Sequence, residues 1–301
     1  MAVEQLLSDF CDQHRLDVSF HQTAKKFYIP LAEKLITQLS GEPYVLGING
    51  CQGSGKSTLA DFVRHYLTNQ HQKNVVNVSI DDIYLTKKER EYLSQYVHPL
   101  LQTRGVPGTH DVDLGLHIVQ SLKQLRSGET LAIPRFDKLK DDRCDRSGWT
   151  QAAGPIDLII FEGWCVGAVP QETAALDEPV NDLEKKEDPF GKWRQHANKE
   201  LQGVYADLFA QIDSLVLLKA PRFESVFDWR LEQERKLAAS LNEEDATHEE
   251  ITIMSEADIG RFVQHYERIT RHNLEVLPDQ ADVIYELDDT RKISNATYRS
   301  Y

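Results

Sequence analysis

A phosphate-binding pattern lies near the start of the sequence. Residues 50–58 read Gly-Cys-Gln-Gly-Ser-Gly-Lys-Ser-Thr and fit the string G-x-x-x-x-G-K-[ST]. In such a loop the glycines let backbone N–H groups turn toward phosphates, the lysine reaches the β- and γ-phosphates, and the first hydroxyl can hold Mg²⁺. The residues that this pattern assigns to a nucleoside triphosphate are Gly50, Gly53, Ser54, Gly55, Lys56, Ser57 and Thr58.

Two acidic residues stand where they could complete such a site. Asp81 follows the apolar run 75–80, and Glu162 follows the apolar run 157–161. Ligands bind at the carboxyl ends of the strands in an open parallel sheet, so we expect both carboxylates near the phosphate loop. A carboxylate at Glu162 can orient Mg²⁺ directly or through water, which makes Ser57 and Glu162 the predicted metal residues. The alternative is that each acid caps a helix or ends a strand in solvent.

Short apolar runs alternate with longer helical patterns along the chain. This order is typical of an α/β fold in which crossover helices flank a parallel sheet. Apolar residues repeat at helical spacing after Lys56, over 112–125 and over 201–209, which predicts helices that cover the sheet. The expected strands are 44–50, 75–80, 131–135, 157–162, 214–219 and 282–287.

The first forty residues have helical apolar spacing and no strand pattern. We therefore expect an N-terminal helical extension over 1–40, followed by one P-loop domain over 41–301. The segments 177–199 and 242–258 are rich in charged residues. We expect both to be solvated excursions from the domain and not parts of its core.

The overall charge limits the partners of the chain. The 301 residues carry a formal net charge of −14, which disfavours nucleic acid and anionic membranes, because these attract an excess of Lys and Arg. No apolar run approaches the roughly 18 residues of a membrane span. Cys11, Cys51, Cys144 and Cys165 form no C-x-x-C pair, which indicates reduced thiols and a cytoplasmic protein. Cys51 lies near a helix N-terminus, which can lower a thiol pKa, although a loop-filling role is the simpler interpretation.

Several blocks of the sequence resemble known small-molecule kinases. The phosphate loop, the Ser-x-Asp-Asp-x-Tyr turn at 79–84 and the Phe-Glu-Gly turn at 161–163 are similar to those of the phosphoribulokinase, uridine kinase and pantothenate kinase group. The blocks Arg-Gly-Val-Pro-Gly-Thr-His-Asp at 104–111 and Pro-Arg-Phe-Asp-Lys at 134–138 resemble, more narrowly, the D-glycerate 3-kinase family. The resemblance implies a P-loop NTPase fold with a small lid. It also implies transfer of the ATP γ-phosphate to a hydroxyl of a small molecule, with D-glycerate, which would give 3-phosphoglycerate, as the leading acceptor.

The resemblance assigns catalytic roles as well. A kinase that acts on an alcohol must orient or deprotonate the hydroxyl and neutralise charge on the transferred group. Asp81 matches the first acid of the family turn and is expected to accept the hydroxyl proton, while Asp82 supports the turn or the metal hydration shell. Lys56, Mg²⁺ and a lid cation would stabilise the transferred phosphoryl group. For the lid cation we favour Arg230 over Arg222, the alternative being that Arg230 is a solvated helix residue.

Two loops supply the expected acceptor residues. The turn-rich loop 104–111 presents Arg104 and His110, although His110 could instead be structural and Asp111 a helix N-cap. The mixed-charge run 135–146 carries cations for an acceptor carboxylate, and an arginine fork suits a carboxylate bidentately. Trp164 either walls the acceptor pocket or only packs. The predicted substrate residues are Tyr84, Arg104, His110, Arg135 and Lys138, with Arg135 first for the carboxylate.

Two positions depart from the family pattern. Val106 stands where the plant enzymes are expected to carry a polar residue, and Leu139 stands where serine is usual. Both favour a second interpretation, a kinase for another small alcohol such as a nucleoside, pantothenate or a sugar phosphate. A third interpretation is a non-catalytic ATP-binding protein. A GTPase is disfavoured because the sequence has no N-K-x-D string.

Overall fold

The computed structural model describes residues 2–240 and 254–299. The strands of its main sheet are β1 (Tyr44–Gly50), β2 (Val75–Ser79), β7 (Leu158–Gly163), β8 (Ser214–Lys219), β9 (Val283–Leu287) and β10 (Ile293–Tyr298). Their order across the sheet is β10-β9-β8-β1-β7-β2. All neighbours are parallel except β10, which is antiparallel to β9. The predicted α/β fold with a parallel sheet is confirmed.

The central strands are buried because their side chains alternate between two apolar cores. Leu46 and Ile48 of β1 lie in one core, whereas Val45 lies in the other. In β7 all six residues are buried. A nearly continuous apolar run is what a parallel strand covered on both faces requires.

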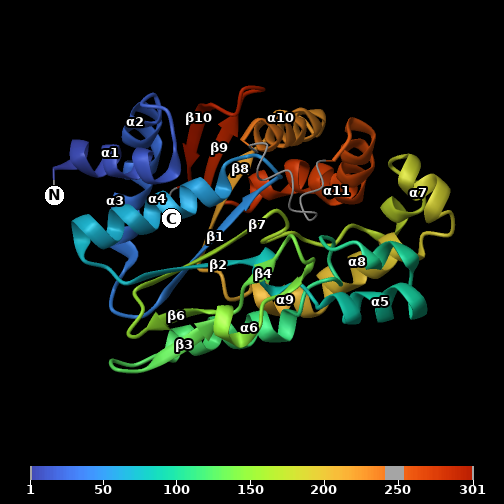
Figure 1. Cartoon of the computed structure of the whole chain (residues 1–301), viewed down its shortest axis with the longest axis horizontal. Helices are drawn as coiled ribbons and strands as arrows, with labels where there is room; N and C mark the ends of the chain where they lie inside the picture. The colour runs from blue at the N-terminus through green and yellow to red at the C-terminus, as the bar shows by residue number, and fades with distance from the viewer. Residues whose placement is uncertain (1, 241–253, 300–301) are drawn as a thin grey trace.

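Helices cover both faces of the sheet (Figure 1). Those on the first core are α1 (Val3–His14), α2 (Phe20–Thr23), the π-helical turn Ala24–Tyr28, α3 (Ile29–Gln38), α4 (Lys56–His71) and α10 (Glu224–Ser240). Those on the second core are α6 (Val112–Gln124), α8 (Lys192–Gln202) and α9 (Val204–Phe209), and α11 (Glu256–Val276) contributes to both cores. Among the described helices, none has the length and apolar character to cross a membrane.

The N-terminal helices pack on α4. Leu6, Leu7 and Phe10 of α1 are fully buried, and the Phe10 ring meets the Phe62 ring of α4 edge-on at 5.2 Å. The helices α1–α3 therefore share a core with the sheet, on the side of α4 in Figure 1. A domain boundary at residue 40 stays a prediction.

The expected strand at 131–135 does not belong to the main sheet, so its predicted place was wrong. It forms β3 (Thr130–Ile133), which pairs antiparallel with β6 (Thr150–Ala153) in a separate small sheet. The physical reason is burial, since Thr130 is exposed and the next two residues are only half-buried. Between β3 and β6 in the sequence, β4 (Phe136–Asp137) and β5 (Asp142–Arg143) form a second antiparallel hairpin. Neither the short strands β4–β6 nor the edge strand β10 was predicted.

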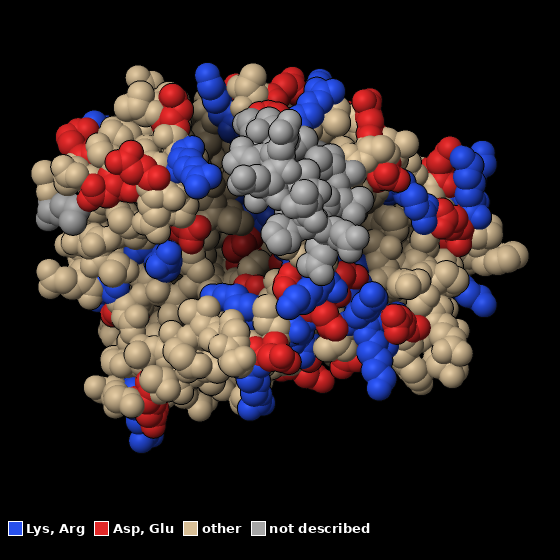
Figure 2. Space-filling model, viewed as in Figure 1, with Lys and Arg blue, Asp and Glu red and all other residues tan. Residues whose placement is uncertain are grey.

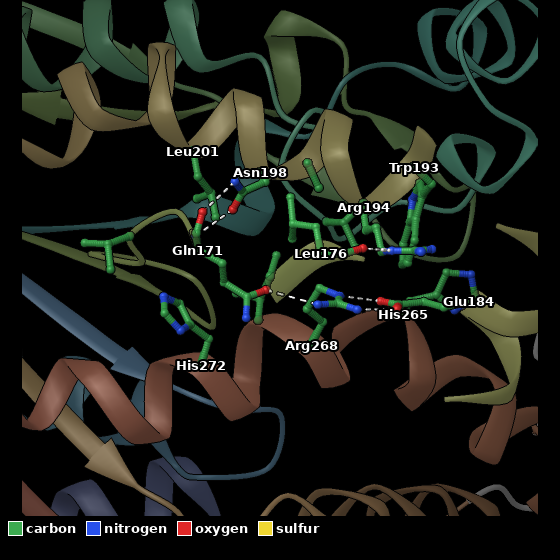
Figure 3. Close-up of a pocket in the computed structure, with 14 residues that line it drawn as sticks. Gln171, Leu176, Glu184, Trp193, Arg194, Asn198, Leu201, His265, Arg268 and His272 are labelled. Carbon is green, nitrogen blue, oxygen red and sulfur yellow. Dashed lines mark hydrogen bonds and ion pairs between the residues drawn. The ribbon is translucent and has the colours of Figure 1, made fainter. Parts of the chain in front are cut away.

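The charged segment 177–199 is not a solvated excursion, and that prediction was wrong. It forms α7 (Asp182–Glu187) and the first part of α8, and three of its charged side chains, Glu184, Asp188 and Arg194, are buried in ion pairs. Glu184 is fully buried against Arg268 (Figure 3). Asp188 is buried against Arg194. Buried charges are stable only when they are paired and hydrogen-bonded. Of the other charged segment, residues 242–253 lie outside the described residues.

The helical pattern over 201–209 is also interrupted. α8 ends at Gln202 and α9 begins at Val204, with Gly203 between them. The N-cap of α5 (Lys87–Tyr96) is Thr86, whose side chain and Glu89 form a reciprocal capping box. In Figure 1, α5 and α8 lie toward the end of the molecule that carries α7.

Candidate active site

The phosphate loop joins the C-terminal end of β1 to the N-terminal end of α4. Gly53 and Gly55 have φ of +80° and +91°, a conformation that residues with a side chain rarely adopt. A side chain at Gly50 would collide, because an added Cβ would lie 2.5 Å from Ser54 Oγ. The predicted strand–loop–helix context is therefore present, and it depends on these glycines.

The first turn of α4 is open to an anion. Within the described structure, no side chain caps this helix N-terminus. Unpaired N–H groups and the helix dipole favour negative charge there. Lys56 begins the helix, and its ammonium group lies in the same cleft as Gln52, Gly53 and Ser57. The arrangement can bind the phosphates of a nucleotide.

Glu162 at the end of β7 faces the phosphate loop. Its Oε1 accepts a hydrogen bond from Ser57 Oγ at 3.0 Å, and its Oε2 lies 3.8 Å from Lys56 Nζ. That Oε2 is buried and has no hydrogen-bond partner among the described residues. Burial alone would lower the pKa of Lys56, but the Glu162 and Asp81 carboxylates outweigh it and raise that pKa. Lys56 is therefore charged.

Asp81 lies in the 3₁₀ turn Ile80–Ile83 that follows β2. Its Oδ1 accepts from the Tyr84 hydroxyl at 2.8 Å, and its Oδ2 accepts from Lys138 Nζ at 2.7 Å. Burial by itself raises the pKa of Asp81. The Lys138 and Lys56 charges, with the hydrogen bonds from Lys138 and Tyr84, outweigh burial and hold that pKa well below its ordinary value. Asp81 is therefore ionised and ready to accept a hydrogen bond.

The two acids and the phosphate loop share one cleft. Figure 2 shows a hollow near the middle of one face, bordered by acidic and basic side chains. The cleft has a volume of about 390 Å³ and lies at the carboxyl ends of the strands. The predicted site residues that line it are Gly53, Lys56, Ser57, Asp81, Tyr84, Arg104, Lys138, Glu162 and Arg230. Residues from six separate stretches of the chain thus meet at one place.

Two aromatic residues fix the loop that carries Arg104. Trp164 Nε1 donates to the Gly105 carbonyl at 3.0 Å, and the Tyr266 hydroxyl donates to the Arg104 carbonyl at 3.1 Å. Their rings meet edge-on at 4.8 Å. Trp164 therefore both walls the cleft and packs. Tyr266 and its neighbour Phe262 were not predicted as site residues, although the block Tyr-Glu-Arg-Ile-Thr at 266–270 also resembles the family.

Comparisons with known proteins agree with this geometry. The model of the KAP family P-loop domain matches residues 25–109. The uncharacterized kinase mug58 of Schizosaccharomyces pombe is 36% identical over 239 residues, which cover 75% of this chain and 79% of that protein. The chloroplastic D-glycerate 3-kinase of Arabidopsis thaliana is 33% identical over 64% of this chain and 41% of its own length. The chain belongs to the same kinase family as mug58, and it is similar to the plant D-glycerate 3-kinase. It is therefore an ATP-dependent kinase that acts on a small molecule.

The fold of this kinase is also that of its structural neighbours. The solved D-glycerate 3-kinase of Cryptococcus neoformans superposes with a TM-score of 0.71 at 24% identity, covering 94% of this chain and all of that one. A putative fructose transport system kinase from Silicibacter superposes with a TM-score of 0.53 at 16% identity, covering 84% of this chain and 94% of that one. Because both identities are below 25%, these structural likenesses show the fold alone. The predicted P-loop kinase fold is confirmed.

Arg135, the first choice for the acceptor carboxylate, does not line the cleft of this kinase. Its Nη1 donates to Asp82 Oδ2 at 2.7 Å and its Nε donates to Thr150, so it ties the turn after β2 to the small β3–β6 sheet. It borders a separate groove along β2 instead. Arg135 and Asp82 form an ion pair, so of the three cations predicted for the substrate only Arg104 and Lys138 line the described cleft.

His110 lies behind the cleft and not in it. The side chain is 5% exposed, stacks on the Tyr84 ring at 4.6 Å, and places Nδ1 2.6 Å from the Tyr205 hydroxyl. Burial lowers the pKa of His110 to about 3, although the Asp81 charge opposes this. His110 is therefore neutral and supports Tyr84, as the structural alternative expected. Asp111 accepts from the Leu114 N–H and caps α6.

The remaining expectations concern Arg230, Arg222 and Cys51. Arg230 of α10 enters the cleft with its guanidinium 5.6 Å from the centre of the Phe262 ring. Arg222 lies outside the cleft and pairs with Asp289 at 3.0 Å.

Burial raises the pKa of Cys51 to about 12 despite the nearby Lys56 charge, so the environment does not lower it. Cys51 fills the loop.

Proposed function

We propose that this kinase transfers the γ-phosphate of ATP to D-glycerate and releases 3-phosphoglycerate. The observation that carries the proposal is an ionised acid, Asp81, flanked by the cations Lys138 and Arg104 beside the phosphate loop. A hydroxy acid has the two groups that such a site can bind, a hydroxyl for the acid and a carboxylate for a cation. The likeness to the plant D-glycerate 3-kinase supports the same acceptor.

The charge of the cleft supports an anionic acceptor. Among the described residues, four cations, Lys56, Arg104, Lys138 and Arg230, line it together with two carboxylates, Asp81 and Glu162. The lining is therefore net positive in a chain whose formal net charge is −14. Oppositely charged small ligands collect in a cleft of this kind. A neutral alcohol could accept hydrogen bonds from Arg104 and Lys138 but has no charge to pair with theirs.

Asp81 serves best as the group that orients the reacting hydroxyl. Its depressed pKa makes it a weak base but a permanent hydrogen-bond acceptor. The hydroxyl can take the place of Lys138 on Oδ2, and the acceptor carboxylate then gives Lys138 a new partner. Because phosphoryl transfer passes through a loose transition state, positioning and charge stabilisation matter more than early proton removal. Lys56 and Arg230 supply that stabilisation from the chain itself.

Ser57 and Glu162 would hold Mg²⁺. The buried, unpartnered Oε2 of Glu162 beside the Ser57 hydroxyl suits a hard cation that prefers oxygen ligands. The described residues contain no group of three His, Cys, Asp or Glu side chains that could hold a metal. Mg²⁺ in kinases needs no such group, since it keeps water and phosphate ligands. When bound, it neutralises charge on the β- and γ-phosphates.

The two departures from the family pattern lie away from the cleft. Val106 is 2% exposed and packs with Leu101 and Trp193 in a separate apolar cluster. Leu139 is 66% exposed on the β4–β5 hairpin and does not line the cleft. Neither residue therefore argues for a nucleoside, pantothenate or a sugar phosphate as the acceptor.

An acceptor panel tests the proposal. Purified protein with ATP and Mg²⁺ is offered D-glycerate, L-glycerate, glycerol, uridine, pantothenate and a pentulose phosphate, and both ADP and the phosphorylated product are measured. We expect the highest kcat/KM with D-glycerate and little turnover with glycerol, which has the hydroxyls but lacks the carboxylate. A higher kcat/KM with any neutral acceptor would contradict the proposal. ADP release that no acceptor stimulates would do the same.

A further inference from the structure

Arg104 is held in the cleft by the hairpin that also carries Lys138. Its Nη1 donates to Asp141 Oδ1, and its guanidinium lies 5.4 Å from the centre of the Phe136 ring. Phe136 and Asp141 belong to the β4–β5 hairpin and its turn. The side chain of Arg104 is 28% exposed, so part of its guanidinium faces the cleft. Its direction therefore depends on this hairpin.

Asp141 has a backbone conformation that turns it toward a second arginine. Its φ is +55°, in the left-handed region that Asp and Asn adopt more readily than most residues. Its carbonyl accepts from Arg90 Nη2 at 2.6 Å, and its Oδ2 lies 3.0 Å from the same nitrogen. One carboxylate thus contacts Arg90 with one oxygen and Arg104 with the other.

Arg90 is a fixed anchor for Asp141. It is 1% exposed, and its Nε and Nη1 donate to the carbonyls of Leu85 and Gln102 at 3.2 and 2.7 Å. Those bonds join the segment after Tyr84 to the segment before Arg104. Because the guanidinium is enclosed and bonded to three backbone segments, it holds Asp141 in one place.

The charges in this group leave Arg104 attractive to an anion. Arg90 and Arg104 share one carboxylate, so the three side chains together are net positive. An Arg104 paired with an unshared carboxylate would be neutralised and would bind an anionic ligand weakly. The shared carboxylate orients Arg104 without cancelling its charge.

We propose that Asp141, anchored by Arg90, is a positioning residue that aims Arg104 at the anionic group of the acceptor and so sets the preference for anionic hydroxy acids. The inference rests on the proposed function, because it needs an acceptor with an anionic group. It assigns Asp141 no contact with the reacting atoms. It predicts an effect on acceptor binding that passes through Arg104 alone.

The test compares Asp141→Gly and Asp141→Asn with the parent enzyme. Both substitutes tolerate a positive φ, so the backbone can keep its shape while the carboxylate is lost. With D-glycerate we expect each variant to raise the acceptor KM roughly tenfold or more, with the KM for ATP and kcat little changed. Lys140→Ala is the matched control, because Lys140 is 75% exposed in the same turn and lies outside the cleft. An unchanged acceptor KM in both Asp141 variants, or an equal rise in the KM for ATP, would overturn the inference.

A double-mutant cycle separates positioning from other effects. If Asp141 acts through Arg104, Asp141→Gly should add little to the acceptor KM of Arg104→Ala. A full additional rise in the double variant would overturn the inference and leave the proposed function intact. A parent enzyme that phosphorylates no anionic acceptor would instead overturn the proposed function, and this inference with it. Thermal unfolding of each variant confirms that the compared proteins are folded.

Discussion

Lys138 Nζ lies 2.7 Å from Asp81 Oδ2 and links a hairpin outside the main sheet to the acid after β2. With Tyr84 on Oδ1, both oxygens of Asp81 have a partner in the described structure. An acceptor hydroxyl could donate to a remaining lone pair of either oxygen, or it could replace one of these contacts. Tyr84 is buried, whereas the Lys138 side chain is 62% exposed. On the proposed function, Lys138 is therefore the partner that an acceptor displaces more readily.

Asp81 and Asp82 should differ sharply in their effect on catalysis. We expect Asp81→Asn to keep ATP binding and to lower kcat by about 10² to 10⁴, the usual range for loss of a catalytic acid or base. Asp82→Asn should cost far less activity, because Asp82 pairs with Arg135 away from the cleft. Single-turnover phosphorylation and ATP titration of both variants measure the two effects. If Asp82→Asn proved the more damaging change, the two acids would have been given the wrong roles.

Lys138 should control the acid limb of the pH–rate profile. Catalysis needs ionised Asp81, so activity is lost as pH falls through the pKa of that carboxyl. Burial raises this pKa, and the charge of Lys138 is the largest of the effects that lower it. Lys138→Met should therefore raise that pKa in the free enzyme and move the acid limb of kcat/KM to higher pH, because kcat/KM reports the ionisable groups of the free enzyme. Lys140→Met on the same hairpin is the control, and an identical shift in both variants would contradict the assignment.

Arg104 and Arg135 allow a matched comparison of two arginines, one that lines the cleft and one that does not. Arg104→Ala should raise the KM for D-glycerate by about 10- to 100-fold, the equivalent of a charge-assisted hydrogen bond of roughly 1.5–3 kcal/mol. Arg135→Ala should leave that KM close to the parent value, because Arg135 faces Asp82 and a different groove. Acceptor and ATP are titrated separately in each variant. A larger rise in the KM for D-glycerate in Arg135→Ala than in Arg104→Ala would show that Arg135, not Arg104, binds the acceptor carboxylate.

Glu162 should govern the response to Mg²⁺. Glu162→Gln keeps the shape of the side chain but removes the charge beside Ser57 and Lys56. We expect the Mg²⁺ concentration for half-maximal activity to rise about tenfold or more, since hard cations prefer charged oxygen ligands. Removal of Mg²⁺ by a chelator should abolish turnover in the parent. An unchanged Mg²⁺ requirement in the variant would exclude Glu162 from the metal site.

His110 should contribute to the pH dependence of stability. Its folded pKa of about 3 lies below its ordinary value of 6.5. Between these values the unfolded chain binds a proton that the folded protein does not, so the free energy of unfolding falls as pH falls below 6.5, by at most about 1.4 kcal/mol per pH unit. Urea unfolding of His110→Asn at pH 7 and pH 5 should show a smaller fall than the parent. His117→Asn, on the exposed side of α6, should keep the parent's dependence.

The sequence carried enough information for the sheet and the phosphate loop because both follow local rules. The glycines of residues 50–55 and the apolar runs of β1, β7 and β8 each have one reasonable interpretation. The acceptor side is different, since Arg104, Lys138 and Tyr266 come together only through tertiary contacts. Arg135 looked like the better carboxylate partner because the sequence does not reveal that Asp82 neutralises it. Likewise, Glu184 and Arg268 are 84 residues apart, and only folding explains why Glu184 of the charged segment 177–199 is buried.

The β4–β5 hairpin pairs only with itself in the described structure and takes no part in the register of the main sheet. Yet it holds Lys138 against Asp81 and Asp141 against Arg104, so a stretch of eight residues, 136–143, determines much of the acceptor side. The hairpin contributes no residue to the phosphate loop and no pairing to the main sheet. On the proposed function, the choice of acceptor and the use of ATP would therefore be separable traits in evolution, and altering one hairpin would be the route to a new substrate.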